Sequence, residues 1–138
     1  MFNELKNYKG GHFIFDNNKL LGEACNAPRD KSGVYIIYTI KDSLTDLVYI
    51  GSSGKIQKDG KFKHCNGGLY DRLVNGKQFG KPRRQSFVDK MIEENIDALD
   101  IYWYDTVSDK DIPATVEGVI IQKYFDANSC LPKWNKAY

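Results

Sequence analysis

The stretch GVYIIYTIKDSLTDLVYIG, residues 33–51, decides the fold because it predicts two strands joined by a short turn. Residues 33–40 and 47–52 are rich in β-branched and aromatic side chains, which favour strands. The segment KDSLTD at 41–46 has the polar composition of a turn. With so short a connection, the two strands are expected to form an antiparallel hairpin.

Each strand of this hairpin carries a tyrosine two residues from a glycine. Gly33 lies beside Tyr35 in the first strand, and Gly51 lies beside Tyr49 in the second. Tyrosine is a good strand residue and could serve packing alone, but glycine weakens a strand and often marks a close approach of another chain or a ligand.

The rest of the chain supplies further strand and helix signals. We expect a short strand at 12–15, a glycine- and lysine-rich loop at 53–67, helices at about 68–76, 84–95 and 113–127, and a strand at 98–106. The order β-β-α-α-β-α predicts an α+β fold with a small, mainly antiparallel three-stranded sheet flanked by helices. Residues 33–138 would form this domain, with residues 1–32 as an extension packed on its core.

The bulk composition is that of an ordinary globular domain. The chain has 138 residues, 41% of them apolar, and no run of 18 apolar residues. Its first residues lack an apolar signal region, so we expect a cytoplasmic protein with no membrane partner. Cys25, Cys65 and Cys130 form no CxxC pair, which favours reduced thiols over a zinc site.

The net charge of +2 hides an uneven distribution. Residues 55–84 hold nine Lys or Arg residues against two Asp residues, a net of +7, and the rest of the chain is acidic. Such a patch attracts polyanions, although a solvated lysine-rich loop is the plainer interpretation.

Glu117 is the clearest chemical candidate. It lies within the apolar stripe of the third predicted helix, four residues before Ile121. A carboxylate in such a place must be paired, protonated or bound to a metal. A salt bridge would satisfy it, and so would a hard cation such as Mg²⁺ facing a cleft.

Other candidates carry weaker signals. Arg72 lies near the inner face of the first predicted helix, where its planar fork suits phosphate. His64 lies in the basic loop, Asn135 could cap a turn, and Trp134 is most simply a core anchor. The Tyr-Trp-Tyr run at 102–104 invites base stacking, but strand alternation favours packing.

Together these residues resemble the GIY-YIG nuclease superfamily. The first motif corresponds to Gly33-Val34-Tyr35 and the second to Tyr49-Ile50-Gly51. The family's helix arginine, metal-binding glutamate and late asparagine match Arg72, Glu117 and Asn135 in order, over about three-quarters of the chain. Each short motif is weak alone, and the ordered set is much more specific.

One position departs from the family pattern. Many members carry a histidine four residues after the arginine, where this chain has Gly76. In some restriction-endonuclease members a lysine and a histidine precede the arginine instead, and Lys61 and His64 resemble that arrangement. If His64 is not the counterpart, a catalytic group is lost.

The resemblance implies a metal-dependent endonuclease, with Mg²⁺ or Mn²⁺ on Glu117 and Arg72 on the phosphate. The two tyrosines would point into the active site, and their glycines would let the phosphodiester approach. We favour Tyr49 as the base, activated by Lys61, although Tyr35 is nearly as good a candidate. His64 would relay a proton or contact the phosphate, and Asn135 would orient a neighbour or a water.

DNA, in double-stranded form, is the expected partner, and RNA stays open. The residues expected to hold its backbone are Lys55, Lys77, Lys81, Arg83 and Arg84. Cutting both strands would require a homodimer or two binding events. Two alternatives remain: a degenerate nucleic-acid-binding protein of the same fold, and a non-catalytic interaction module.

Overall fold

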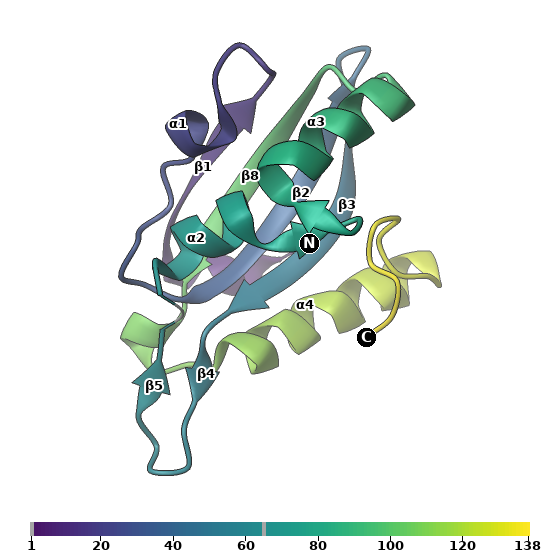
Figure 1. Ribbon diagram of the computed structural model, residues 1–138. Helices are drawn as coiled ribbons and strands as arrows, with labels where there is room; N and C mark the ends of the chain where they lie inside the picture. The colour runs from purple at the N-terminus through teal and green to yellow at the C-terminus, as the bar shows by residue number, and fades with distance from the viewer. Residues whose placement is uncertain (1, 65) are drawn as a thin grey trace.

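The computed structural model describes residues 2–64 and 66–138. A four-stranded antiparallel sheet in the order β1-β8-β2-β3 crosses the molecule (Figure 1). Its strands are β1 (Lys9–Phe15), β2 (Gly33–Lys41), β3 (Leu44–Ser53) and β8 (Ala98–Asp105). Two small hairpins are formed by β4 (Lys55–Ile56) with β5 (Phe62–Lys63), and by β6 (Lys77–Gln78) with β7 (Lys81–Pro82).

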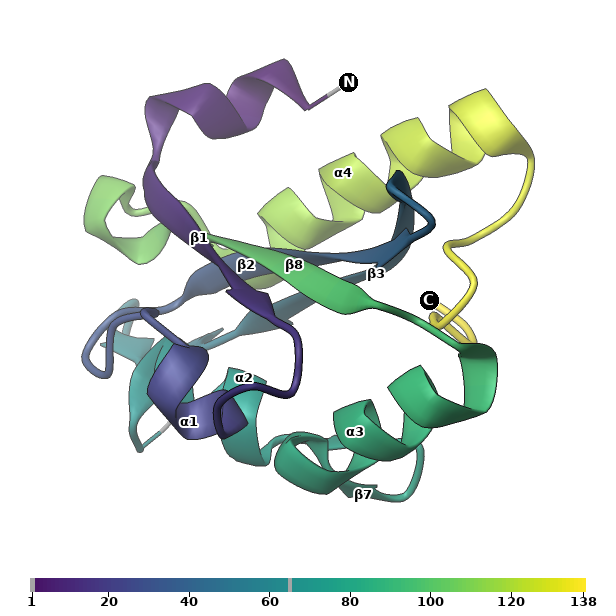
Figure 2. The ribbon, with the colours of Figure 1, turned by 90° about the horizontal axis from the view of Figure 1, so that it is seen from above.

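Helices cover both faces of the sheet. The α-helices are α1 (Leu21–Ala24), α2 (Gly68–Asn75), α3 (Arg83–Glu94) and α4 (Pro113–Asn128), and the 3-10 helices are η1 (Asn3–Asn7) and η2 (Val107–Asp109). Figure 2 shows α1, α2 and α3 on one face, with α4 and η1 on the other. Each face has its own apolar core, one centred on Phe87, Leu99 and Ile101 and the other on Ile36, Ile50 and Ile120.

The expected α+β class with a mainly antiparallel sheet is confirmed, but the sheet has four strands rather than three. The predicted short strand at 12–15 is the end of β1, which pairs with β8 through contacts such as Phe13 with Ile101. The partner of β1 lies almost ninety residues away in the chain, so no local sequence pattern predicts the pairing.

The connections also differ from expectation. The turn predicted over 41–46 is only Asp42-Ser43, with φ of 52° and 65°, so β2 and β3 extend further than predicted. Two consecutive positive φ values match the right-handed twist of a hairpin. The predicted loop at 53–67 contains the β4–β5 hairpin.

Two further expectations can be compared with the structure. Within the described residues, no helix is long and apolar enough to cross a membrane. Cys25 and Cys130 are free thiols, and burial raises the pKa of Cys25 to about 11. Cys65 lies outside the described residues.

Candidate active site

The two motif tyrosines lie side by side on neighbouring strands. Tyr35 of β2 is buried and Tyr49 of β3 is half-buried, and their ring centroids are 6.1 Å apart. Gly51 lies directly opposite Tyr35 in the sheet. A Cβ at Gly51 would come within 2.7 Å of both rings, so this glycine makes room for the tyrosine pair.

At both motif glycines, the space that a Cβ would need is taken by other parts of the protein. A Cβ at Gly33 would collide with the Tyr104 carbonyl of β8 and with the backbone nitrogen of Thr106, just after that strand. Gly33 allows the close approach of a neighbouring strand, and Gly51 allows the packing of the tyrosine rings. The approach of a phosphodiester to these strands stays a prediction.

Arg83 completes this tyrosine–arginine cluster (Tyr35, Tyr49 and Arg83). We expected Arg83 to hold DNA at the surface, but it is only 2% exposed. Its Nε donates to Gln78 Oε1 at 3.0 Å and its Nη1 donates to the Arg72 carbonyl at 2.8 Å. Its guanidinium lies 5.0 Å from the Tyr35 ring centroid and 5.5 Å from that of Tyr49, within reach of a cation–π interaction.

Arg83 also accounts for the departure at Gly76. A Cβ at Gly76 would lie 3.2 Å from both Arg72 Cδ and Arg83 Nη1, and would collide with the Arg72 carbonyl. A side chain in this position would crowd the Arg72 carbonyl and the Arg83 guanidinium. The positive charge beside the tyrosines thus comes from Arg83, at the start of α3.

The environment of Tyr49 disfavours ionisation of its phenol. Burial, the neighbouring Tyr35 and the charge of Glu117 raise the pKa of Tyr49 to about 12, against the opposing influence of Arg83. We expected Lys61 to activate this phenol. The cation that acts on it is Arg83, because Lys61 lies at the exposed turn of the β4–β5 hairpin.

Glu117 of α4 lies beside Ser52, near the end of β3. Glu117, Ser52 of β3 and Arg72 of α2 form what we call the carboxylate cluster. The Ser52 hydroxyl donates to Glu117 Oε1 at 2.5 Å. Burial raises the pKa of Glu117, while the Ser52 hydrogen bond and the Arg72 charge oppose that rise. Because β3 is an edge strand, a side chain from α4 and one from α2 can meet here from opposite faces of the sheet.

The carboxylate cluster fits a hard cation. It offers carboxylate and hydroxyl oxygens, which are suitable Mg²⁺ ligands. Among residues 2–64 and 66–138, no group of three or more His, Cys, Asp or Glu side chains gathers around one point. A magnesium ion here would therefore be held by one carboxylate, waters and substrate phosphate, which is a common arrangement for this ion.

His64 and Asn135 are each fixed by one partner. His64 Nδ1 lies 2.6 Å from Ser32 Oγ, next to Gly33 at the start of β2. The Asn135 amide accepts from the Ile50 N–H and donates to the Ile50 carbonyl, both at 3.0 Å. Asn135 thus fastens the last residues to β3 beside Tyr49, and its neighbour Trp134 is buried in the core as expected.

The other predicted basic contacts lie at the surface. Lys55, Lys77, Lys81 and Arg84 are exposed. Lys81 pairs with Asp89, and Arg84 donates to Asn75. Lys77 and Lys136 line a hollow of about 430 Å³ that also reaches Tyr49 and Asn135. Tyr49 therefore borders a hollow that is lined by two lysines.

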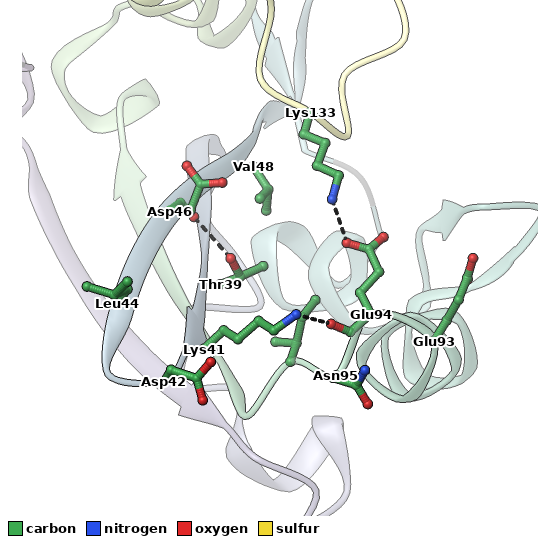
Figure 3. A pocket seen from close by; sticks show the side chains of 11 residues that line it. Thr39, Lys41, Asp42, Leu44, Asp46, Val48, Glu93, Glu94, Asn95 and Lys133 are labelled. Atoms are coloured by element: carbon green, nitrogen blue, oxygen red, sulfur yellow. Dashed lines mark hydrogen bonds and ion pairs between the residues drawn. The ribbon is translucent and has the colours of Figure 1, made fainter.

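A second hollow, of about 570 Å³, lies at the Asp42–Ser43 end of the sheet (Figure 3). Both of its lysines bond Glu94. Lys133 Nζ lies 2.9 Å from Glu94 Oε1, and Lys41 Nζ donates to the Glu94 carbonyl. Four carboxylates against two lysines give it a negative balance, which would repel DNA.

Comparison with known proteins identifies no relative: no family model, no curated protein and no solved structure matches the chain.

Proposed function

We propose that this chain is a metal-dependent endonuclease of the GIY-YIG type that hydrolyses phosphodiester bonds in DNA. The observation that carries the proposal is the arrangement at the edge of β3. The stacked motif tyrosines lie beside a buried arginine, and Glu117 is held by Ser52, three residues along the same strand from Tyr49. The Lys77 and Lys136 hollow supports access by a polyanion.

The side chains divide the work as follows. Arg72 binds a non-bridging oxygen of the phosphate, where its charge stabilises the developing negative charge. A divalent cation on Glu117 would supply charge stabilisation at the phosphate and the leaving oxygen. Tyr49 orients the attacking water and accepts its proton, and Tyr35 and Arg83 hold the Tyr49 ring in place.

The pKa of Tyr49 makes a specific demand on this mechanism. A phenol with a pKa of about 12 is almost entirely protonated at pH 7. The rate should therefore rise about tenfold per pH unit from neutral to mildly alkaline pH, because the phenolate fraction does so. A rate that does not rise with pH would show that the Tyr49 phenol is not the base, and His64, whose ring is held by Ser32, would be the next residue to test.

A plasmid-cleavage assay tests the function. The parent protein should nick supercoiled DNA with Mg²⁺ or Mn²⁺ and not with EDTA, and Glu117→Gln should be inactive. Glu93→Gln is the matched control, since Glu93 is exposed on α3 and lines the hollow beside Leu44, at the opposite end of β3 from Ser52. Salt-sensitive DNA binding without cleavage under any of these conditions would favour the degenerate binding protein. The absence of both would favour the interaction module.

A further inference from the structure

We propose that the β4–β5 hairpin is an arm that enters the major groove of duplex DNA beside the candidate active site. The arm comprises residues 55–63. The choice of DNA as its partner rests on the proposed function. Figure 1 shows the arm projecting away from the sheet and helices, at the end of the molecule where α4 begins.

The base of the arm is tied to the candidate site. Gly54 has a φ of 99°, and Ser32 occupies the space that a Cβ there would need. On the other side of the hairpin, His64 contacts the same serine. Ser52, which bonds Glu117, lies two residues before Gly54. The arm's direction is therefore fixed relative to the carboxylate cluster, while its outer residues are exposed.

The charges on the arm suit a polyanion. The arm contains four lysines and a single acidic residue, Asp59. The lysines are Lys55, Lys58, Lys61 and Lys63. Lys55 lies directly opposite Lys63 in the hairpin. Like charges in directly opposed positions destabilise a strand pair. Phosphate groups of DNA beside these lysines would offset the repulsion between them. DNA binding would therefore stabilise the pairing of Lys55 with Lys63.

The dimensions select the major groove. From Lys55 to its tip at Asp59 the arm extends four residues, or at most roughly 13 Å at the rise of a strand. A two-stranded ribbon fits the major groove, which is about 12 Å wide and about 8.5 Å deep, whereas the minor groove is about 6 Å wide. Lysines at the base would then contact phosphates, and the exposed Gln57 at the turn would reach base edges.

Binding measurements with cleavage abolished test the arm directly. In a Glu117→Gln background, we would measure affinity for a 25-base-pair duplex over a range of salt concentrations. Lys55→Gln/Lys63→Gln should raise Kd about tenfold and lower the salt slope by about 1.8, because two phosphate contacts are lost. Lys19→Gln/Lys41→Gln removes the same charge at exposed positions away from the arm and should change Kd less than twofold.

A second variant distinguishes the two grooves. Replacing residues 56–62 by Asn-Gly keeps a hairpin turn and removes the arm. The Glu117→Gln protein should protect guanine N7, in the major groove, from methylation by dimethyl sulfate, and the shortened variant should not. Equal N7 reactivity in both complexes, or equal losses of affinity in the arm and control lysine pairs, would overturn the proposal.

These results can be separated from those on the proposed function. If the parent cuts plasmid but the arm variants bind duplex normally, the arm is wrong and the nuclease stands. If the parent never cuts but the arm variants lose binding and N7 protection, the arm stands and the nuclease is wrong.

Discussion

The tyrosine–arginine cluster and the carboxylate cluster lie along the same edge strand, but they are built in different ways. Tyr35 and Arg83 are each 2% exposed, and ring packing and buried hydrogen bonds fix them. Ser52, Arg72 and Glu117 are only half-buried, and a few polar contacts position them. The first cluster is part of the core, whereas the second can exchange its partners for ligands. Substitutions of Tyr35 and Arg83 should therefore affect mainly stability, and substitutions in the second cluster mainly activity.

Glu117→Gln should have the largest effect. We expect a loss of about 1000-fold in cleavage rate, or about 4 kcal/mol of transition-state stabilisation. Stability at pH 7 should be unchanged or higher. Because folding raises the pKa of Glu117, its contribution to stability is complete at low pH and is lost as pH rises through the folded-state pKa. Urea unfolding should thus show that the free energy of unfolding of the parent increases relative to that of the variant as the pH falls from 7 to 4. If Glu117→Gln is unfolded at pH 7, the carboxylate cluster is needed for stability, and the contrast between the two clusters is wrong.

Arg83→Met should be the most damaging substitution for folding. It leaves Oε1 of the half-buried Gln78 without its donor and removes one of the two donors to the Arg72 carbonyl, which keeps the Gly76 N–H, at a cost of about 3 kcal/mol. Arg84→Met is the matched control, because Arg84 is the exposed neighbour on the same helix and should cost less than about 0.5 kcal/mol. Urea denaturation measures both. Equal stabilities would show that Arg83 is no part of the core.

Asn135→Ala should have an intermediate effect. Two hydrogen bonds to the Ile50 backbone are lost, for about 1–2 kcal/mol of unfolding free energy. Lys136→Ala, one residue further on and exposed, provides the control. If thermal melting gives the same Tm for both variants, the bonds of Asn135 contribute nothing measurable.

Tyr49→Phe should show the smallest stability effect, confined to alkaline pH. Folding raises the pKa of Tyr49 from 10.0 to about 12, so its stabilising contribution is present below pH 10 and is lost as pH rises to about 12. The parent should lose more stability than the phenylalanine variant across this window. Parallel curves, recorded by unfolding at successive pH values, would mean that the Tyr49 phenol titrates normally in the folded protein.

Local patterns were enough to predict much of the fold. The hairpin at 33–51, the strand near 98–106 and three of the helices follow from periodicity and breaker residues. The central place of β8 and the addition of β1 were missed, since Gly10 and Gly11 weaken the strand signal and the pairing is remote in sequence. The β4–β5 hairpin was hidden by its lysines and glycines, which are typical of loops.

Local sequence patterns also predicted part of the candidate site. The tyrosines and Glu117 follow from strand and helix patterns, and the structure brings Tyr35 and Tyr49 together. Arg83 looked like a surface cation because an arginine beside another arginine normally is one. Only the packing of three aromatic rings around its guanidinium buries it. The one sequence signal for the burial of Arg83 was Gly76, because a residue without a side chain leaves room for the Arg83 guanidinium.

The tail that carries Asn135 has a consequence for association between molecules. An exposed edge strand is a template for pairing with another chain. In the middle of β3, the Val48 carbonyl accepts from the Trp134 N–H, and both backbone groups of Ile50 bond the amide of Asn135. The side chain of one asparagine thus imitates a peptide group of a fifth strand. Cutting the chain after Leu131 would expose this edge, and the shortened protein should self-associate through β3 and aggregate.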